Sequence, residues 1–432
     1  MQIKVLKVLG IGLMAALTII GISLFSRTAK TFGTSDVMIA AKEHTEDHHD
    51  ANIAGFSKGV LSEQLGAAIR GNGFPTHFDF KIDGHTQATK VQYTLDATSQ
   101  IAMQKLMNQY QPDYGAFIAM DAKTGKILSM VSYSHVAPDQ ENLTLRASFP
   151  AASVFKVVTA SAAIDMNKAV PSTVVPFNGA LHTLYKRNVE STIDNRWTRH
   201  MTMREAFARS VNVFFSKLGL FYVGPQNLQM YAERYFFNHQ IKADVPVQMG
   251  YAKFSPDDPW SVATAASGYT RDNTMSPLQG ALIAAAVAND GVMMEPYLIE
   301  NLSDDAGAML YQGGPHQASV VVEPASAETL RELFHETVIA GTSRKSFRQT
   351  NHRSLYGDVE FGGKTGSLMG LDPKGKCDWF VGYARYHDQR IAVAALTVNE
   401  KKWKIKASMI SNIFFQQYLK DLKRNEQVAA IK

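Results

Sequence analysis

One stretch, residues 149–160, limits what this chain can fold into more than any other. It places Ser153 and Lys156 three residues apart, just after Pro150 and at the head of an apolar run. If the segment is helical from about Ala152, the two side chains lie one turn apart on the same face. Apolar residues then surround most of the helix, which we expect inside a domain; they are Val154, Phe155, Val157, Val158, Ala160, Ala162, Ala163 and Ile164.

Lys156 would then be a poorly solvated lysine beside a hydroxyl, which is a costly arrangement. The cost suggests a use, because a serine hydroxyl is a weak nucleophile until a base takes its proton. Desolvation and a nearby cation both lower the pKa of a lysine towards the range in which its amine can be that base. In the alternative interpretation, Ser153 merely begins the helix and Lys156 extends to solvent. Of all the serines in the chain, only Ser153 has a lysine at the third following position.

Composition excludes several classes of protein. The 432 residues suffice for one large domain and something smaller, and the net charge of +5 is mild. Basic residues are scattered without an aromatic-rich basic stripe, so we expect no nucleic-acid partner. Cys377 is the single cysteine, which excludes an intrachain disulfide and a cysteine-based metal site, and we interpret it as structural. Residues 43–50 are rich in His, Asp and Glu but lack ordered ligand spacing, so we interpret them as a solvated connector and expect neither metal nor cofactor.

The N-terminus has the pattern of a membrane anchor. Lys4 and Lys7 precede an uncharged run over 8–25, and Arg27 follows it. This length suits a single membrane-spanning helix with a basic cytoplasmic end. A cleaved signal peptide is the alternative, but its apolar region is usually shorter and residues 26–30 form a poor cleavage site. We therefore predict a cytoplasmic tail over 1–7, an anchor over 8–26, and all later residues outside the cytoplasm.

The rest of the chain divides into a linker and small pedestal region over 27–90, a main domain over 91–422 and a tail over 423–432. In the main domain, strands come first, helices occupy the middle, and strands with a helix close the chain. This order predicts an α+β domain whose first and last parts share a central antiparallel sheet flanked by helices, with a mostly helical subdomain. The predicted strands are 78–82, 91–95, 114–120, 127–133, 358–365, 378–387 and 390–399; the predicted helices are 56–69, 99–110, 202–218, 225–235, 276–288 and 405–422.

Two further motifs follow the first. Ser210-Val211-Asn212 lies between apolar stretches, and Lys364-Thr365-Gly366-Ser367 follows two glycines near a strand. The order Ser-x-x-Lys, Ser-x-Asn, Lys-Thr-Gly is typical of penicillin-recognising serine acyltransferases. Over residues 91–422 the chain resembles a penicillin-binding protein of the membrane-anchored, monofunctional (class B-like) D,D-transpeptidase type. Three other segments resemble this family, at 116–130, 273–296 and 378–383.

A second Lys-Thr-Gly triplet, at Lys123, precedes Ser153 and lies in a predicted hairpin turn beside Asp121. These are features of a solvated turn. Lys364 instead follows both other motifs and precedes Ser367, a hydroxyl suited to carboxylate binding. We therefore expect Lys364, and not Lys123, in the site.

The resemblance implies a function and a role for each motif residue. Ser153 would attack a D-alanyl-D-alanine peptide bond and Lys156 would take its proton. Ser210 would relay a proton to the leaving amine, and Asn212 would hold Lys156 and the substrate amide. Lys364, Thr365 and Ser367, in the strand that includes Gly366, would bind the terminal carboxylate. The backbone N–H groups of Ser153 and Ser367 would form the oxyanion hole.

The resemblance also implies partners: peptidoglycan stem peptides, β-lactams as covalent inhibitors, the bacterial cytoplasmic membrane and a separate glycosyltransferase.

The motifs depart from the family pattern in two places. Ala152 precedes Ser153 where the family more often has Pro-Gly-Ser, and Ser367 stands where Thr is commoner. A D,D-carboxypeptidase or endopeptidase remains an alternative, because only the acceptor differs. A β-lactamase is disfavoured because Glu233 lacks the expected Glu-x-x-Leu-Asn setting. Intact motifs also disfavour a non-catalytic scaffold of wall synthesis.

Overall fold

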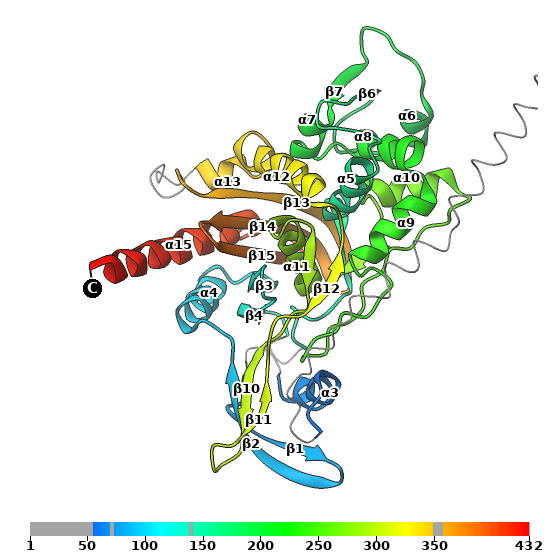
Figure 1. Ribbon diagram of the computed structural model, residues 1–432. Helices are drawn as coiled ribbons and strands as arrows, with labels where there is room; N and C mark the ends of the chain where they lie inside the picture. Colours follow the sequence, from blue (N-terminus) through cyan, green and yellow to red (C-terminus); the bar gives the residue numbers. More distant parts are fainter. Residues whose placement is uncertain (1–54, 70–72, 138–140, 349–356, 432) are drawn as a thin grey trace, which may run out of the picture. The chain divides into compact units, whose positions relative to one another are not determined.

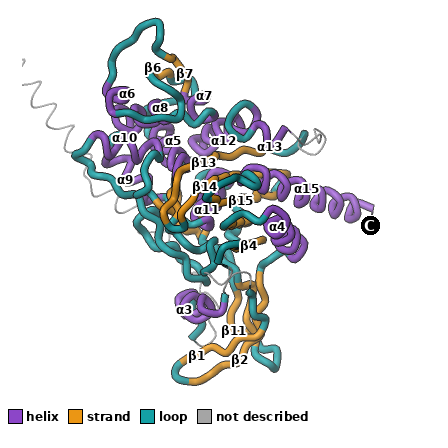
Figure 2. Tube along the Cα trace, turned by 180° about the vertical axis from the view of Figure 1, so that it is seen from behind, coloured by secondary structure: helices purple, strands orange, loops and turns teal. Residues whose placement is uncertain are grey.

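The computed structural model describes residues 55–69, 73–137, 141–348 and 357–431. Residues 51–432 form one compact unit, shown as a ribbon in Figure 1 and from behind in Figure 2. The predicted anchor over 8–26 lies outside the described residues. Within those residues, no helix combines the length and the apolar character that crossing a bilayer requires.

A five-stranded antiparallel sheet organises the fold, with strand order β13-β14-β15-β3-β4. The first and last parts of the chain therefore share one sheet, as predicted, and they join where β15 pairs with β3, Ala394 opposite Ile118. Strand β13 lies at an edge. The strands are β3 (Tyr114–Asp121), β4 (Ile127–Ser134), β13 (Glu360–Leu371), β14 (Lys374–Tyr386) and β15 (Gln389–Asn399).

The sheet separates two hydrophobic cores because its strands are apolar on both faces. Trp379 and Val381 of β14 belong to one core, and the intervening Phe380 belongs to the other. Helix α11 packs against β14 and β15 on the first side, and α12 packs against β13. On the other side α4 packs against β4 and α15 against β14 and β15. These helices are α4 (Ala97–Tyr110), α11 (Pro277–Ala288), α12 (Pro324–Ile339), α13 (Arg344–Arg348) and α15 (Ala407–Ile431).

The middle of the chain forms the helical subdomain, visible in green in Figure 1. Its elements are the 3-10 helix η1 (Ala152–Phe155), α5 (Lys156–Asp165), α6 (Lys186–Glu190), α7 (Met203–Ala208), α8 (Asn212–Lys217), the π-helix η2 (Leu218–Val223), α9 (Pro225–Arg234) and α10 (Pro259–Ser267). Short strand pairs accompany them: β5 (Phe149–Pro150) with β8 (Thr274–Met275), β6 (Val174–Phe177) with β7 (Arg199–Thr202), and β9 (Val292–Met294) with β12 (Gln317–Val320).

The single helix predicted over 202–218 is wrong. Helix α7 begins with a capping box formed by Thr202 and Glu205, and it ends at Ala208. Ser210 then takes a left-handed backbone conformation, with φ of 57°, and α8 begins at Asn212. Apolar residues continue through the break because both helices face the same core, so their periodicity cannot reveal it.

A second, four-stranded sheet has the order β1-β2-β10-β11. Its strands are β1 (His77–Ile82), β2 (His85–Tyr93), β10 (Ile299–Ser303) and β11 (Met309–Gln312), and α3 (Lys58–Ala68) lies nearby in both views. Strand β2 pairs with β10, with Val91 opposite Leu302. The strand predicted over 91–95 thus pairs, as part of β2, with a segment about two hundred residues later, whereas the strand predicted over 78–82 pairs with β2 as β1. The division of the chain at residue 90 stays a prediction.

Candidate active site

Ser153 lies in η1, and Lys156 is the first residue of α5. The turn that presents Ser153 is held from both sides: Trp379 Nε1 donates to the Pro150 carbonyl at 2.9 Å, and Ala151 N donates to the Asn273 carbonyl at 2.7 Å. Ala152 takes a left-handed conformation with φ of 49°, which costs a residue with a Cβ about 1–2 kcal/mol. This is the position at which the commoner family motif has glycine. The nucleophile turn is therefore strained in this chain.

Lys156 is fully buried, and its Nζ lies 2.7 Å from Ser153 Oγ. The same nitrogen donates to Asn212 Oδ1 at 2.8 Å and to the Ser267 carbonyl at 2.5 Å. A neutral amine has two N–H groups and one lone pair, so these two acceptors use both hydrogens and leave the lone pair for the serine hydroxyl. Burial, assisted by the charge of Lys364, holds the pKa of Lys156 well below its usual value. The pair is therefore arranged for general-base activation of Ser153.

Asn212 begins α8, and its side chain links Lys156 to a loop. Its Nδ2 donates to the His182 carbonyl at 2.7 Å, and its backbone N donates to the Leu181 carbonyl at 2.8 Å. The amide is therefore held with its oxygen towards Lys156. The predicted contact between Asn212 and Lys156 is present.

Lys364 lies on β13 and is fully buried. Its Nζ donates to Ser210 Oγ at 2.9 Å and to the Thr365 carbonyl at 2.8 Å, and it lies 5.5 Å from the centroid of the Phe207 ring. Burial lowers the pKa of Lys364 to about 7. Within the described chain, no carboxylate forms an ion pair with either Lys156 or Lys364. Both amines are therefore held by neutral groups.

A cavity of about 380 Å³ collects the motif residues at its surface: Ser153, Ser210, Asn212, Thr365, Gly366 and Ser367 line it. The two lysines lie behind this lining and hydrogen-bond to it. Strand β13 touches η1 at Gly366, where an added Cβ would lie 3.3 Å from both the Ala151 carbonyl and the Val154 nitrogen. All eight residues proposed from the sequence thus belong to one site.

Sequence reasoning assigned no role to several further lining residues, among them His182, Gly268, Tyr269 and Thr342. Thr342 Oγ1 hydrogen-bonds Thr365 Oγ1 at 2.5 Å. Gly268 has φ of 67°, and an added Cβ would meet the Ala152 carbonyl at 1.9 Å, so only glycine fits beside the nucleophile turn. No spacing in the sequence connects these residues to the motifs.

His182 lies at the exposed edge of this cavity. Partial burial, with the charges of Lys156 and Lys364, lowers the pKa of its imidazole, against the opposing effect of its hydrogen bond to the Ser210 backbone. The ring is therefore electrostatically coupled to both lysines.

Lys123 lies elsewhere, as predicted. It is exposed in the turn between β3 and β4, where its backbone N donates to Asp121 Oδ1 at 2.8 Å. Cys377 is buried, and burial raises the pKa of its thiol to about 12. Neither residue contributes to the cavity lining.

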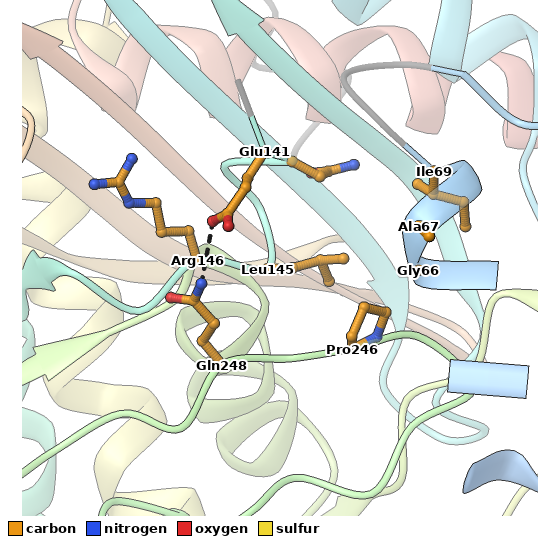
Figure 3. A pocket seen from close by; sticks show the side chains of 9 residues that line it. Gly66, Ala67, Ile69, Glu141, Leu145, Arg146, Pro246 and Gln248 are labelled. Atoms are coloured by element: carbon orange, nitrogen blue, oxygen red, sulfur yellow. Dashed lines mark hydrogen bonds between the residues drawn. The ribbon is translucent and has the colours of Figure 1, made fainter. Parts of the chain in front are cut away.

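A second cavity, of about 420 Å³, lies between the end of α3 and the segments around Leu145 and Pro246. Figure 3 shows its lining, in which Gln248 donates to Glu141 at 3.2 Å. None of the eight motif residues lines it. It is therefore distinct from the site that contains Ser153.

Comparisons with known proteins agree with this geometry. Residues 115–420 match the family model described as the penicillin binding protein transpeptidase domain. The peptidoglycan D,D-transpeptidase PbpA of Mycolicibacterium smegmatis is 28% identical over 325 residues, which cover 66% of this chain and 62% of that protein. The chain therefore spans somewhat less than two thirds of that relative.

Solved structures show the same fold. The D,D-transpeptidase domain of a peptidoglycan glycosyltransferase from Eggerthella lenta matches with a TM-score of 0.63 at 24% identity, covering 77% of this chain and 84% of that one. Penicillin-binding protein A from Mycobacterium tuberculosis, in an imipenem acyl-enzyme complex, matches with a TM-score of 0.61 at 24% identity, covering 77% and 80%. The predicted α+β fold is therefore confirmed for the described part of the chain.

Proposed function

Because the chain belongs to the penicillin-binding protein transpeptidase family, we propose that it is a serine D,D-transpeptidase that cross-links peptidoglycan stem peptides through an acyl-enzyme. One observation carries the proposal most directly. The Nζ of Lys156 lies 2.7 Å from Ser153 Oγ, fully buried and hydrogen-bonded only to neutral oxygens in the contacts described above. This is the environment that a lysine needs to act as a base.

In the acylation step, Ser153 Oγ attacks the carbonyl carbon of the penultimate D-alanine and Lys156 takes the hydroxyl proton. The carbonyl oxygen becomes an oxyanion, which the backbone N–H groups of Ser153 and Ser367 would stabilise. Each such donor lowers a barrier by about 3 kcal/mol. Collapse of this intermediate forms the ester bond and breaks the peptide bond.

The leaving amine needs a proton, and Ser210 is placed to deliver it. Its hydroxyl lies 2.9 Å from Lys364 Nζ and lines the cavity with Ser153. Ser210 gives its proton to the departing D-alanine and regains one from the Lys156–Lys364 network. Lys364, Thr365 and Ser367 bind the terminal carboxylate, which would also favour the protonated form of Lys364.

The edge position of β13 supports an extended substrate. An unpaired strand edge can add a peptide by main-chain hydrogen bonds, and β13 carries Lys364, Thr365, Gly366 and Ser367. In the second step, the amine of another stem peptide attacks the ester and Ser153 is released. Water as the acceptor would make the protein a D,D-carboxypeptidase or endopeptidase instead. β-Lactams would acylate the same serine.

The remaining proposals concern location. We infer that residues 8–26 anchor the chain in the bacterial cytoplasmic membrane, with residues 1–7 in the cytoplasm, 27–90 as linker and pedestal, and 91–422 as the catalytic domain outside the cytoplasm. The uncharged run over 8–25 supports this arrangement. A separate glycosyltransferase would supply the glycan strands.

The first experiment tests the nucleophile. The full chain in detergent should form a stable covalent adduct with a fluorescent penicillin, and Ser153→Ala should abolish it. Ser303→Ala, in the second sheet, is the matched control and should label normally. Labelling that persists in Ser153→Ala would contradict the proposal.

A second experiment identifies the acceptor. A synthetic stem peptide is supplied with and without an amine acceptor, and products are separated by mass. Cross-linked product is expected with the acceptor. Hydrolysis alone would favour the carboxypeptidase alternative, and rapid turnover of the penicillin would indicate a β-lactamase.

A further inference from the structure

Beyond Ser367, the cavity that contains Ser153 continues to a cluster of cationic and aromatic side chains. Trp403, Lys376 and Lys406 line it there. The Nζ of Lys376 lies 4.3 Å from the centroid of the Trp403 ring, and that of Lys406 lies 4.8 Å from it. Trp403 is 40% exposed, and both lysines are exposed. Two ammonium groups and one indole face therefore meet at the end of the cavity.

The charge of this cluster is not balanced. Asp378 is the acidic residue of the lining, and it is nearly buried at 9% exposure. Its Oδ2 accepts a hydrogen bond from Ala407 N at 2.9 Å, at the start of α15. One carboxylate, already used by a helix terminus, faces two ammonium groups. A net positive charge therefore remains at this end of the cavity.

Two lysines near this cluster, unlike Lys376 and Lys406, have carboxylate partners. Lys404 lies 3.7 Å from Asp113 and donates to the Gln111 carbonyl at 2.5 Å, and Lys374 pairs with Glu400 at 3.1 Å. In the described part of the chain, Lys376 and Lys406 form no such ion pair. Lys376 and Lys406 thus combine an unpaired ammonium group with a place in the cavity lining, where a ligand can reach them.

The position of the cluster relates it to an extended substrate. In the β13–β14 pair, Ser367 lies opposite Asp378 and Met369 opposite Lys376. Lys376 is therefore two residues beyond the register of Ser367, or about 7 Å along the strand. A peptide paired with the free edge of β13 comes level with Lys376 within a few residues of the bond that Ser153 attacks. Strand β13 then lies between the peptide backbone and the strand that carries Lys376.

We propose that Lys376, Trp403 and Lys406 form a subsite for a carboxylate on the acyl-donor stem peptide, a few residues from the reacting bond. This rests on the proposed function. The two ammonium groups bind the carboxylate, and the exposed indole face packs against the aliphatic part of the side chain that carries it. The subsite selects donors that are anionic at this position.

The test compares two donor peptides that differ only in one side chain, a carboxylate in one and its carboxamide in the other, two residues before the scissile bond. The readout is kcat/KM for release of terminal D-alanine by the full-length protein. The wild type should prefer the carboxylate peptide about tenfold. The double variant Lys376→Gln/Lys406→Gln should reduce this preference to less than about twofold, through a slower reaction with the carboxylate peptide only.

The matched control is Lys401→Gln/Lys402→Gln, which removes the same charge from exposed residues that do not line the cavity, in the loop that carries Trp403 and Lys406. It should keep the preference, which separates a subsite from long-range attraction. Equal rates for both peptides in the wild type, or an unchanged preference in the double variant, would overturn the proposal. So would a preference that appears only when the carboxylate is moved to the acceptor peptide. Failure of the wild type to bind penicillin would instead contradict the proposed function.

Discussion

Two groups of basic residues flank β13, and they are held in opposite ways. Near its middle, Lys156 and Lys364 are fully buried among neutral oxygens. Near its start, Arg331 lies 2.8 Å from Asp290 and 3.0 Å from Glu360. Arg385 pairs with the same two carboxylates, and Arg390 pairs with Asp290.

The chemistry follows from the difference in partners. The three guanidinium groups keep their protons and lower the pKa of Asp290, although its burial opposes this. Within the described residues the two amines form no ion pair with an acid, so burial lowers their pKa values and makes the neutral form accessible. The arginine–carboxylate cluster stabilises the sheet, whereas lysines without a carboxylate partner can lose and regain a proton.

The largest effect is expected from variants in which residue 156 can no longer accept and release a proton. Lys156→Arg keeps the positive charge but cannot lose its proton, so the rate constant for acylation by a fluorescent penicillin should fall by a factor of about 10²–10⁴. In Lys156→Met, which has no amine, this rate constant should fall by the same factor. If Lys156→Arg retains most of the rate, the lysine acts through its charge and not as a base. Circular dichroism checks that both variants fold.

The second prediction concerns the free energy of unfolding as a function of pH. Burial lowers the pKa of Lys364 to about 7 in the folded protein, from an ordinary value of 10.5. Between these values the unfolded chain binds the extra proton, so stability rises with pH. Lys364→Met removes this contribution. From pH 7 to pH 9 the wild type should gain about 2 kcal/mol more than the variant, measured by urea unfolding.

If the free energy of unfolding rises equally with pH in the wild type and in Lys364→Met, then Lys364 has the same protonation in the folded and unfolded states. Arg331→Met serves as the comparison, because an arginine does not titrate in this range. Its pH slope should match that of the wild type even if its stability is lower.

The smallest effect is expected in the arginine cluster. Asp290→Asn removes the carboxylate shared by three arginines and tolerates the left-handed backbone at this position, where φ is 52°. Because Asp290 is 34% exposed, solvent screening limits the loss to about 1–2 kcal/mol. That contribution is present above pH 3.8 and is lost as pH falls through the lowered pKa of Asp290.

Acylation of Asp290→Asn by penicillin should stay within about twofold of the wild type. Asp305→Asn, which changes an exposed acid in the turn between β10 and β11, is the control and should leave stability unchanged. A large loss of acylation in Asp290→Asn would show that the two basic groups are coupled through β13.

Several features of the fold and site were predictable because they depend on local pattern. The strands predicted over 114–120 and 390–399 pair with each other in the structure. The apolar surroundings of Lys156 predicted a buried amine. The break between α7 and α8 was not predictable, since the left-handed Ser210 interrupts no hydrophobic period. Gly268 and Thr342 also carry no local signal, because their roles depend on contacts with distant segments.

The sequence by itself determined which groups we expect to react, since the order of three motifs names Ser153, Lys156, Ser210, Asn212 and Lys364. Only the tertiary structure decided the surroundings that set the charge of the two amines. Folding brings Lys364 to Ser210 and Lys156 to Asn212, and among the described residues no carboxylate forms an ion pair with either amine. The free energy of an ammonium group depends on what replaces its water, and that is set by segments far apart in the chain.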